Sequence, residues 1–319
     1  MKKIIVTLLM VMLVLTGCSE KSGEKPTIGV LQLAEHKSLD ATYQGMIDVL
    51  DEKLGKDNYD VNLKNAQGNM TNVQLIAEQF VKDKVDIIYA IGTNAAQTAY
   101  NVTEGTDTVV VFNAVTDPVA AGLVESNDKP GERITGVSDI SPAKKQFQLV
   151  KELLPEVKRV GIVYNIAEVN SKVQIETLVP IAEEMGIEIL SQGVATMQDL
   201  PLAAKQLASK VDAFYNTTDN MVVSATSTIV DVANEARIPV FASEDGAFDE
   251  GILATESLSY LKLGRRGGDI VYDILRGTKK AQEIPVVVSE ETELFINKDQ
   301  AKDLGIELSK ETLSRISNQ

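Results

Sequence analysis

The chain has very little of the chemistry on which common enzymes depend. Its 319 residues include one cysteine, Cys18, and one histidine, His36. This scarcity excludes the common Cys–His nucleophile pairs and most zinc sites. Signature loops are absent too: there is no Gly-x-Ser-x-Gly, no Walker loop and no Gly-x-Gly-x-x-Gly after an expected strand. We therefore expect no catalytic residue, no metal site and no cofactor.

Basic residues are also scarce. The chain has 31 lysines and arginines against 46 acidic residues, which gives a formal net charge of −15. Such a surface repels phosphate backbones, so nucleic acid is not an expected partner. It also matches anionic lipid poorly, so electrostatic attraction does not explain attachment to a membrane. Solubility accounts for the acidity.

The first 18 residues have the pattern of an export signal. Lys2 and Lys3 precede an apolar run from Ile4 to Leu15, which is too short to span a bilayer as a helix. The sequence Leu-Thr-Gly-Cys follows and resembles a bacterial lipobox, which implies cleavage after residue 17 and a lipid on Cys18. Residues 1–17 are then the signal peptide and 18–26 a lipidated cysteine with a polar tether. The alternative, an uncleaved anchor with an incidental cysteine, explains the position of Cys18 less well.

Apolar runs alternate with amphipathic segments from Thr27 onward. Runs such as 85–91 and 108–115 are apolar on both sides, and helical spacing of apolar residues fills the intervals between them. Strands of this kind belong to parallel sheets that are covered on both faces. The pattern pauses at 128–132 and restarts, which indicates two α/β units of similar size. The trailing elements after residue 252 depart from simple alternation, and such elements often complete earlier sheets.

Small polar residues follow many of the expected strands. In open parallel sheets, ligands bind beyond the carboxyl ends of the strands. Helix N-termini at this edge favour a carboxylate, and a buried ammonium needs an acidic partner. The candidate ligand-binding residues are Ser38, Thr93, Asn94, Thr116, Asp139, Asn170, Ser171, Asp219 and Glu244.

The same residues also have structural interpretations. Ser38, Thr93 and Ser171 are suited to cap helices, which is worth about 1 kcal/mol each. Asp219 is suited to the same task. His36 has the chemistry of a general base or a metal ligand, but we favour a polar residue at the lip of the cleft.

Several stretches resemble a known family. Taken together they are similar to substrate-binding lipoproteins of ABC importers, in the branch that binds tryptophan and other aromatic amino acids. The stretches run in order along the chain: Ile28–Gln32, His36–Asp40, Thr93–Gln97, Val115–Pro118, Thr135–Asp139, Asn170–Gln174 and Thr218–Asn220.

The resemblance implies a periplasmic binding protein-like fold of type I. In that fold two doubly wound parallel-sheet lobes are joined by a three-crossover hinge, with crossovers expected near Gly136, Ile252 and Glu283. Lobe 1 would then hold residues 27–136 plus 252–283. Lobe 2 would hold 137–251 plus 284–319.

The resemblance also implies roles and partners. Ser38, Thr93, Asn94 and Ser171 would hold the α-carboxylate of an amino acid, and Asp219 with Asp139 its ammonium. The ligand is expected to be aromatic or large and apolar, and the partners to be an ABC permease and its ATPase. The protein would be lipid-anchored on the extracytoplasmic face of the cell membrane.

Three alternatives stay open at this point. The first is a ligand sensor that signals to a membrane receptor. The second is a binding protein for another small solute, such as a sugar or a nucleoside. The third is a cell-envelope hydrolase, which predicts turnover that disappears on Asp219→Ala or His36→Ala.

Overall fold

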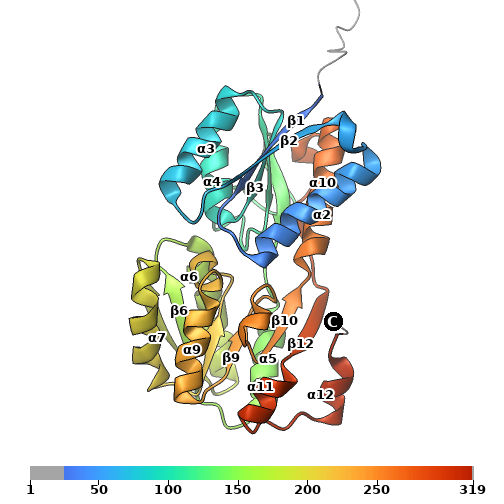
Figure 1. Cartoon of the computed structure of the whole chain (residues 1–319). Helices are drawn as coiled ribbons and strands as arrows, with labels where there is room; N and C mark the ends of the chain where they lie inside the picture. The colour runs from blue at the N-terminus through green and yellow to red at the C-terminus, as the bar shows by residue number, and fades with distance from the viewer. Residues whose placement is uncertain (1–24, 318–319) are drawn as a thin grey trace, which may run out of the picture.

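The computed structural model describes residues 25–317 and shows two α/β lobes stacked end to end (Figure 1). The signal peptide, Cys18 and most of the tether lie outside the described residues. Each lobe contains one six-stranded sheet, and every strand pair is parallel except β10 with β12. The prediction of two doubly wound parallel-sheet lobes is therefore confirmed.

Lobe 1 has the strand order β11-β5-β4-β3-β1-β2. Its strands are β1 (Thr27–Gln32), β2 (Asp60–Asn65), β3 (Ile87–Ile91), β4 (Val109–Asn113), β5 (Ile134–Ser138) and β11 (Val287–Val288). Its helices are α2 (Lys37–Lys53), α3 (Met70–Lys82), α4 (Thr93–Val102) and α10 (Tyr260–Leu275), with short 3₁₀ turns at η1 (Lys56–Asn58) and η4 (Ala281–Glu283).

Lobe 2 repeats the arrangement with the order β12-β10-β9-β8-β6-β7. Its strands are β6 (Arg159–Asn165), β7 (Glu188–Val194), β8 (Ala213–Asn216), β9 (Val240–Ala242), β10 (Ala254–Leu258) and β12 (Thr292–Ile296). Its helices are α5 (Ala143–Leu153), α6 (Val169–Glu184), α7 (Leu200–Ala208), α8 (Asn220–Val223), α9 (Thr226–Ala236), α11 (Lys298–Asp303) and α12 (Lys310–Arg315), with 3₁₀ turns at η2 (Met197–Asp199) and η3 (Phe248–Glu250).

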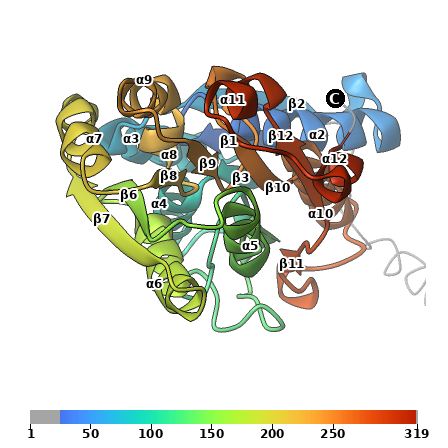
Figure 2. The same cartoon turned by 90° about the horizontal axis from the view of Figure 1, so that it is seen from below.

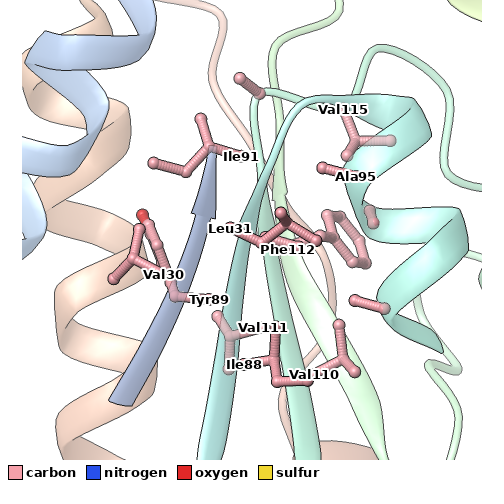
Figure 3. Packing of buried hydrophobic residues seen from close by; sticks show 14 of the residues in the cluster. Val30, Leu31, Ile88, Tyr89, Ile91, Ala95, Val110, Val111, Phe112 and Val115 are labelled. Carbon is pink, nitrogen blue, oxygen red and sulfur yellow. The ribbon is translucent and has the colours of Figure 1, made fainter. Parts of the chain in front are cut away.

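The cores explain why the sheets are parallel. All five residues of β3 are buried, as the continuous apolar run predicts. Figure 3 shows Ile88, Val110 and Phe112 packed within the core of lobe 1. In lobe 2 one apolar cluster lies under α7 and α9 and another under α5 and α6, on opposite faces of the sheet (Figure 2). Burial on both faces leaves no strand side for polar residues, which therefore gather at the strand ends.

The chain crosses between the lobes three times, but not at the predicted residues. Val137 and Ser138 still belong to β5, because they pair with β11. Likewise β10 pairs with β9 and β12 in lobe 2. The crossovers therefore lie at 139–142, at Ser259 and at 289–291, and the predicted boundaries near Gly136, Ile252 and Glu283 are wrong by a few residues. The reason is physical: a strand ends at the last residue that pairs with a neighbouring strand, and that neighbouring strand is far away in the sequence.

Helices α2 and α10 of lobe 1 pack with their backbones in contact. A Cβ at Gly45 would lie 2.2 Å from the carbonyl oxygen of Leu261, and one at Gly264 would lie 2.2 Å from that of Thr42. Only glycine permits this approach. Since α2 begins beside the interlobe cleft and α10 begins at a crossover, this packing fixes the start of both helices relative to each other.

Candidate ligand-binding site between the lobes

The carboxyl ends of the two sheets face each other and enclose a small cavity, here named the polar chamber. Its volume is about 10 Å³, which is room for roughly one water molecule. Both lobes contribute to its lining, together with Asp139 of the first crossover and Tyr260 directly after the second. The lining residues are His36, Leu39, Ala114, Thr116, Asp139, Asn170, Thr218, Asn220, Val223, Glu244 and Tyr260.

A larger groove lies beside the polar chamber and shares Asn220 with it. This groove, here named the mouth groove, has a volume of about 770 Å³ and is formed by loops that follow β1, β2, β3, β6, β7 and β8. Met70, Met197 and Met221 give it an apolar, adaptable surface. Asn94 and Glu168 are buried at its base.

The polar chamber is acidic, and none of the described residues that line it is a lysine or an arginine. Asp139 is 3% exposed and Glu244 is 2% exposed, and no lysine or arginine among residues 25–317 lines either cavity. Burial, together with the neighbouring Asp245, raises the pKa of Glu244 to about 8, and burial also raises the pKa of Asp139. Buried carboxylates of this kind are stabilised by a cation.

Both carboxylates are held in place by hydroxyl groups. The Asp139 carboxylate accepts hydrogen bonds from Thr116 Oγ1 at 3.0 Å and from the hydroxyl of Tyr260 at 2.8 Å. Glu244 accepts from Ser38 Oγ of the other lobe and from the backbone N–H of Gly246 at 3.2 Å. In this closed arrangement of the lobes, hydrogen bonds therefore fix the positions of both carboxylates.

Polar contacts also join the lobes around the polar chamber. Besides Ser38 with Glu244, the hydroxyls of Thr116 and Thr218 lie 3.2 Å apart. His36 Nε2 lies 3.3 Å from Asn220 Oδ1. The lobes are thus closed on each other, and each contact joins an end of one sheet to an end of the other.

Three long helices begin at this edge without a side-chain cap. The first residues of α2, α4 and α6 receive no side-chain hydrogen bond from their N-cap residues His36, Gly92 and Glu168. The start of α4 carries Thr93 and Asn94, and Asn94 lines the mouth groove. An uncapped helix start offers free N–H groups and a partial positive charge, which suit an anion.

Six of the predicted site residues surround the two cavities. Thr116, Asp139, Asn170 and Glu244 line the polar chamber, and Asn94 lines the mouth groove. Ser38 contacts Glu244 from the opposite lobe. Thr93 is buried at the first turn of α4 and does not line either cavity.

Ser171 and Asp219 line neither the polar chamber nor the mouth groove. Asp219 Oδ1 accepts from the backbone N–H of Val222, at the start of α8, at 3.0 Å. Its Oδ2 accepts from the N–H of Asn165 at 2.6 Å and from Ser171 Oγ at 2.7 Å. Burial and the nearby charge of Glu168 raise the pKa of Asp219 to about 7. This geometry does not support the prediction that Asp219 holds an ammonium, because both oxygens accept hydrogen bonds from groups of lobe 2 and neither cavity includes the residue.

Sequence reasoning missed several lining residues. Tyr260 follows a crossover and lies 121 residues from Asp139, so no local pattern connects them. Thr218 and Asn220 flank Asp219, and the polar strand end was a usable signal for both. His36 was expected at the lip, but its Nδ1 is shielded from solvent and burial lowers the pKa of the imidazole to about 4.

The described part of the chain lacks both a metal-binding cluster and a membrane-spanning helix. No group of three or more histidine, cysteine, aspartate or glutamate side chains in residues 25–317 is arranged to hold a metal ion. Over the same residues no helix has the length and apolar character needed to cross a membrane.

Two lobes that close over a polar cleft define a type I binding protein, and comparison with known proteins gives the family. The family model for ABC transporter substrate binding proteins matches residues 27–319, so the chain belongs to that family. Members bind a small molecule outside the cytoplasm in partnership with an ABC transporter.

Individual relatives agree with this. The chain is 41% identical over 308 residues to a protein named tyrosine-binding protein from Clostridioides difficile strain R20291, a match that covers 92% of this chain and 88% of the relative. A solved structure from Streptococcus pneumoniae, an ABC domain in complex with L-Trp, is 33% identical, has a TM-score of 0.88 and covers 92% of this chain and 99% of its own.

A second solved structure differs in an informative way. The ligand-free, open form of a substrate-binding protein with adhesive properties from Clostridium difficile is 38% identical and covers 92% of this chain and 98% of its own, yet its TM-score is 0.69. The L-Trp complex is less identical but superimposes better. The lobes of this chain are therefore arranged more like those of the complex than those of the open form.

Proposed function

We propose that the chain captures an aromatic amino acid between its lobes and delivers it to the permease and ATPase of an ABC importer, without catalysing a reaction. The acidic polar chamber is the observation that carries this proposal. Asp139 and Glu244 are buried there without a lysine or arginine in the lining. The tyrosine-binding relative and the L-Trp complex support the aromatic class.

The ammonium group of the ligand fits the polar chamber in size and charge. An ammonium is about as large as the water molecule for which the cavity has room. It would neutralise carboxylates that burial otherwise drives toward protonation. Asp139 and Glu244 replace Asp219 in this role.

The remainder of the ligand fits the mouth groove. The uncapped start of α4, where Asn94 lines the groove, would receive the α-carboxylate. The methionines of both lobes, Met70, Met197 and Met221, would pack against the aromatic ring, which favours contact with sulfur. A ligand placed in this way contacts both lobes and shifts the population toward the closed form.

A thermal-shift screen of the purified chain tests the proposal. L-tyrosine, L-phenylalanine and L-tryptophan would be compared with tyramine, with des-amino analogues, with sugars and with nucleosides. A ligand at 100 times its Kd stabilises the native state by about 2.7 kcal/mol, so Tm should rise by roughly 5 °C for at least one aromatic amino acid. A rise with sugars or nucleosides alone would refute the amino-acid site.

We also propose that a lipid on Cys18 anchors the protein to the outer face of the cytoplasmic membrane. The Leu-Thr-Gly-Cys sequence at 15–18 supports it. Replacing Cys18 with alanine should move the protein from the membrane fraction to the soluble fraction of lysed cells. Sedimentation of the variant with membranes, to the same extent as the wild type, would contradict the anchor.

A further inference from the structure

Glu168 is at the N-cap position of α6, yet its side chain serves a different helix. Its carboxylate accepts hydrogen bonds from the backbone N–H groups of Asn220 at 3.0 Å and Met221 at 3.2 Å, at the start of α8. It also accepts from the side-chain amide nitrogens of Asn220 at 2.7 Å and Asn170 at 3.0 Å. Glu168 is 3% exposed, and no salt bridge to it is present in residues 25–317.

These contacts determine which way two amide groups face. A carboxylate can only accept hydrogen bonds, so the NH₂ groups of Asn170 and Asn220 must point toward Glu168. The Asn170 amide nitrogen donates in addition to the carbonyl oxygen of Thr218 at 2.9 Å. The amide oxygens are therefore turned away from Glu168.

The two amide oxygens have different surroundings. Asn220 Oδ1 lies 3.3 Å from His36 Nε2 of the opposite lobe. Asn170 Oδ1 is buried and finds no hydrogen-bond partner among the described residues, although Asn170 lines the polar chamber and is 2% exposed. A buried acceptor without a partner is costly, and a ligand donor relieves that cost.

We propose that Glu168 is a positioning residue that makes this site selective for ligands carrying an amine. It holds Asn170 so that Oδ1 joins Asp139 and Glu244 as a third acceptor for the ligand. An ammonium has three N–H donors, which these three groups match. The inference rests on the proposed amino-acid site and names the residue that sets its preference for an amine.

An amide cannot replace the carboxylate in this role. Glutamine at position 168 would turn one NH₂ group toward donors that now point at an oxygen. Either an asparagine amide reverses or a backbone N–H loses its acceptor. Reversal of Asn170 would present its NH₂ group to the ligand's ammonium, and two donors cannot bond to each other.

The test compares Glu168→Gln with the wild type, using L-tyrosine, L-tryptophan and the des-amino analogue of each. Calorimetry and, for weak ligands, displacement would give the dissociation constants. We expect the variant to bind the amino acids at least tenfold more weakly and the des-amino analogues within twofold of the wild type. Glu176→Gln, exposed on the same helix, is the matched control and should change neither.

A second variant keeps the test decisive if Glu168→Gln does not fold. Asn170→Ala removes the proposed acceptor directly and should give the same selective loss. Equal losses for amino acids and des-amino analogues in both variants would reduce Glu168 to a packing role and overturn the inference. If the wild type binds no aromatic amino acid, the proposed function itself fails, which is a distinguishable result.

Discussion

Replacing Glu244 with glutamine is expected to weaken amino-acid binding by at least about 100-fold. Removing one partner of a buried ion pair costs about 3 kcal/mol or more, because the remaining charge is left without compensation. Glu244 has the required surroundings: it is 2% exposed, burial raises its pKa to about 8, and its hydrogen bond to Ser38 joins the two lobes. Calorimetric titration with the aromatic amino acid that gives the largest thermal shift would measure the loss.

Asp249→Asn is the matched control for that experiment. Asp249 lies on the same β9–β10 connection and also contacts the other lobe, through an ion pair with Lys37 at 2.8 Å. Its side chain is 76% exposed, so the pair is screened by solvent and worth at most about 1 kcal/mol. The control should therefore lose no more than about fivefold in affinity. Equal losses for the two variants would place the ammonium away from Glu244.

Replacing Gly246 with alanine is expected to hold the lobes apart. A Cβ on this residue of lobe 2 would lie 2.2 Å from Ser38 Oγ and 2.9 Å from the backbone nitrogen of Ser38 in lobe 1. The nitrogen belongs to the first turn of α2, so it cannot rotate away as a side chain can. Overpacking of this kind costs about 1–3 kcal/mol. Most of the cost falls on the closed form, because the third near atom, Glu244 Oε2 of lobe 2 at 2.8 Å, is the end of a flexible side chain that can turn away. Affinity should fall by roughly tenfold or more.

Small-angle scattering distinguishes this effect from a folding defect. With the wild type, saturating ligand should reduce the radius of gyration. The Gly246→Ala variant should stay extended at the same ligand concentration, while its Tm without ligand stays within about 1 °C of the wild type, because open lobes do not meet at this residue. Full compaction of the variant with ligand would show that the contact does not govern closure.

The periodicity of the sequence was sufficient to predict two α/β units with parallel sheets. Strands such as β3 are apolar on both sides because helices cover both faces of the sheet, and this burial leaves a local pattern. The same reasoning placed polar residues at the strand ends, and Thr116, Asp139, Asn170 and Glu244 do line one cavity. The crossovers were misplaced because the end of a strand depends on a partner far along the chain, as β5 depends on β11.

The sequence alone did not show which of the acidic residues is available to bind a ligand. Asp219 and Glu244 both follow an apolar strand of lobe 2, so their local patterns are alike. Asp219 directly precedes a helix, and its oxygens are taken by lobe 2 groups, namely the N–H of Val222 and the Asn165–Ser171 pair. Glu244 instead bonds to Ser38 across the cleft. Which carboxylate is free for a ligand depends on what surrounds it in three dimensions.

The sequence by itself therefore determined the two-lobed α/β architecture and the edge at which polar groups gather, since both follow from burial that repeats along the chain. Only the tertiary structure decided which of those groups form the site. The polar chamber joins residues as distant as His36, Asp139 and Tyr260, and it exists because the lobes meet and α2 packs on α10. Polar groups whose hydrogen bonds are satisfied within one lobe hold the fold, and the polar groups that face the cleft are available to bind a ligand.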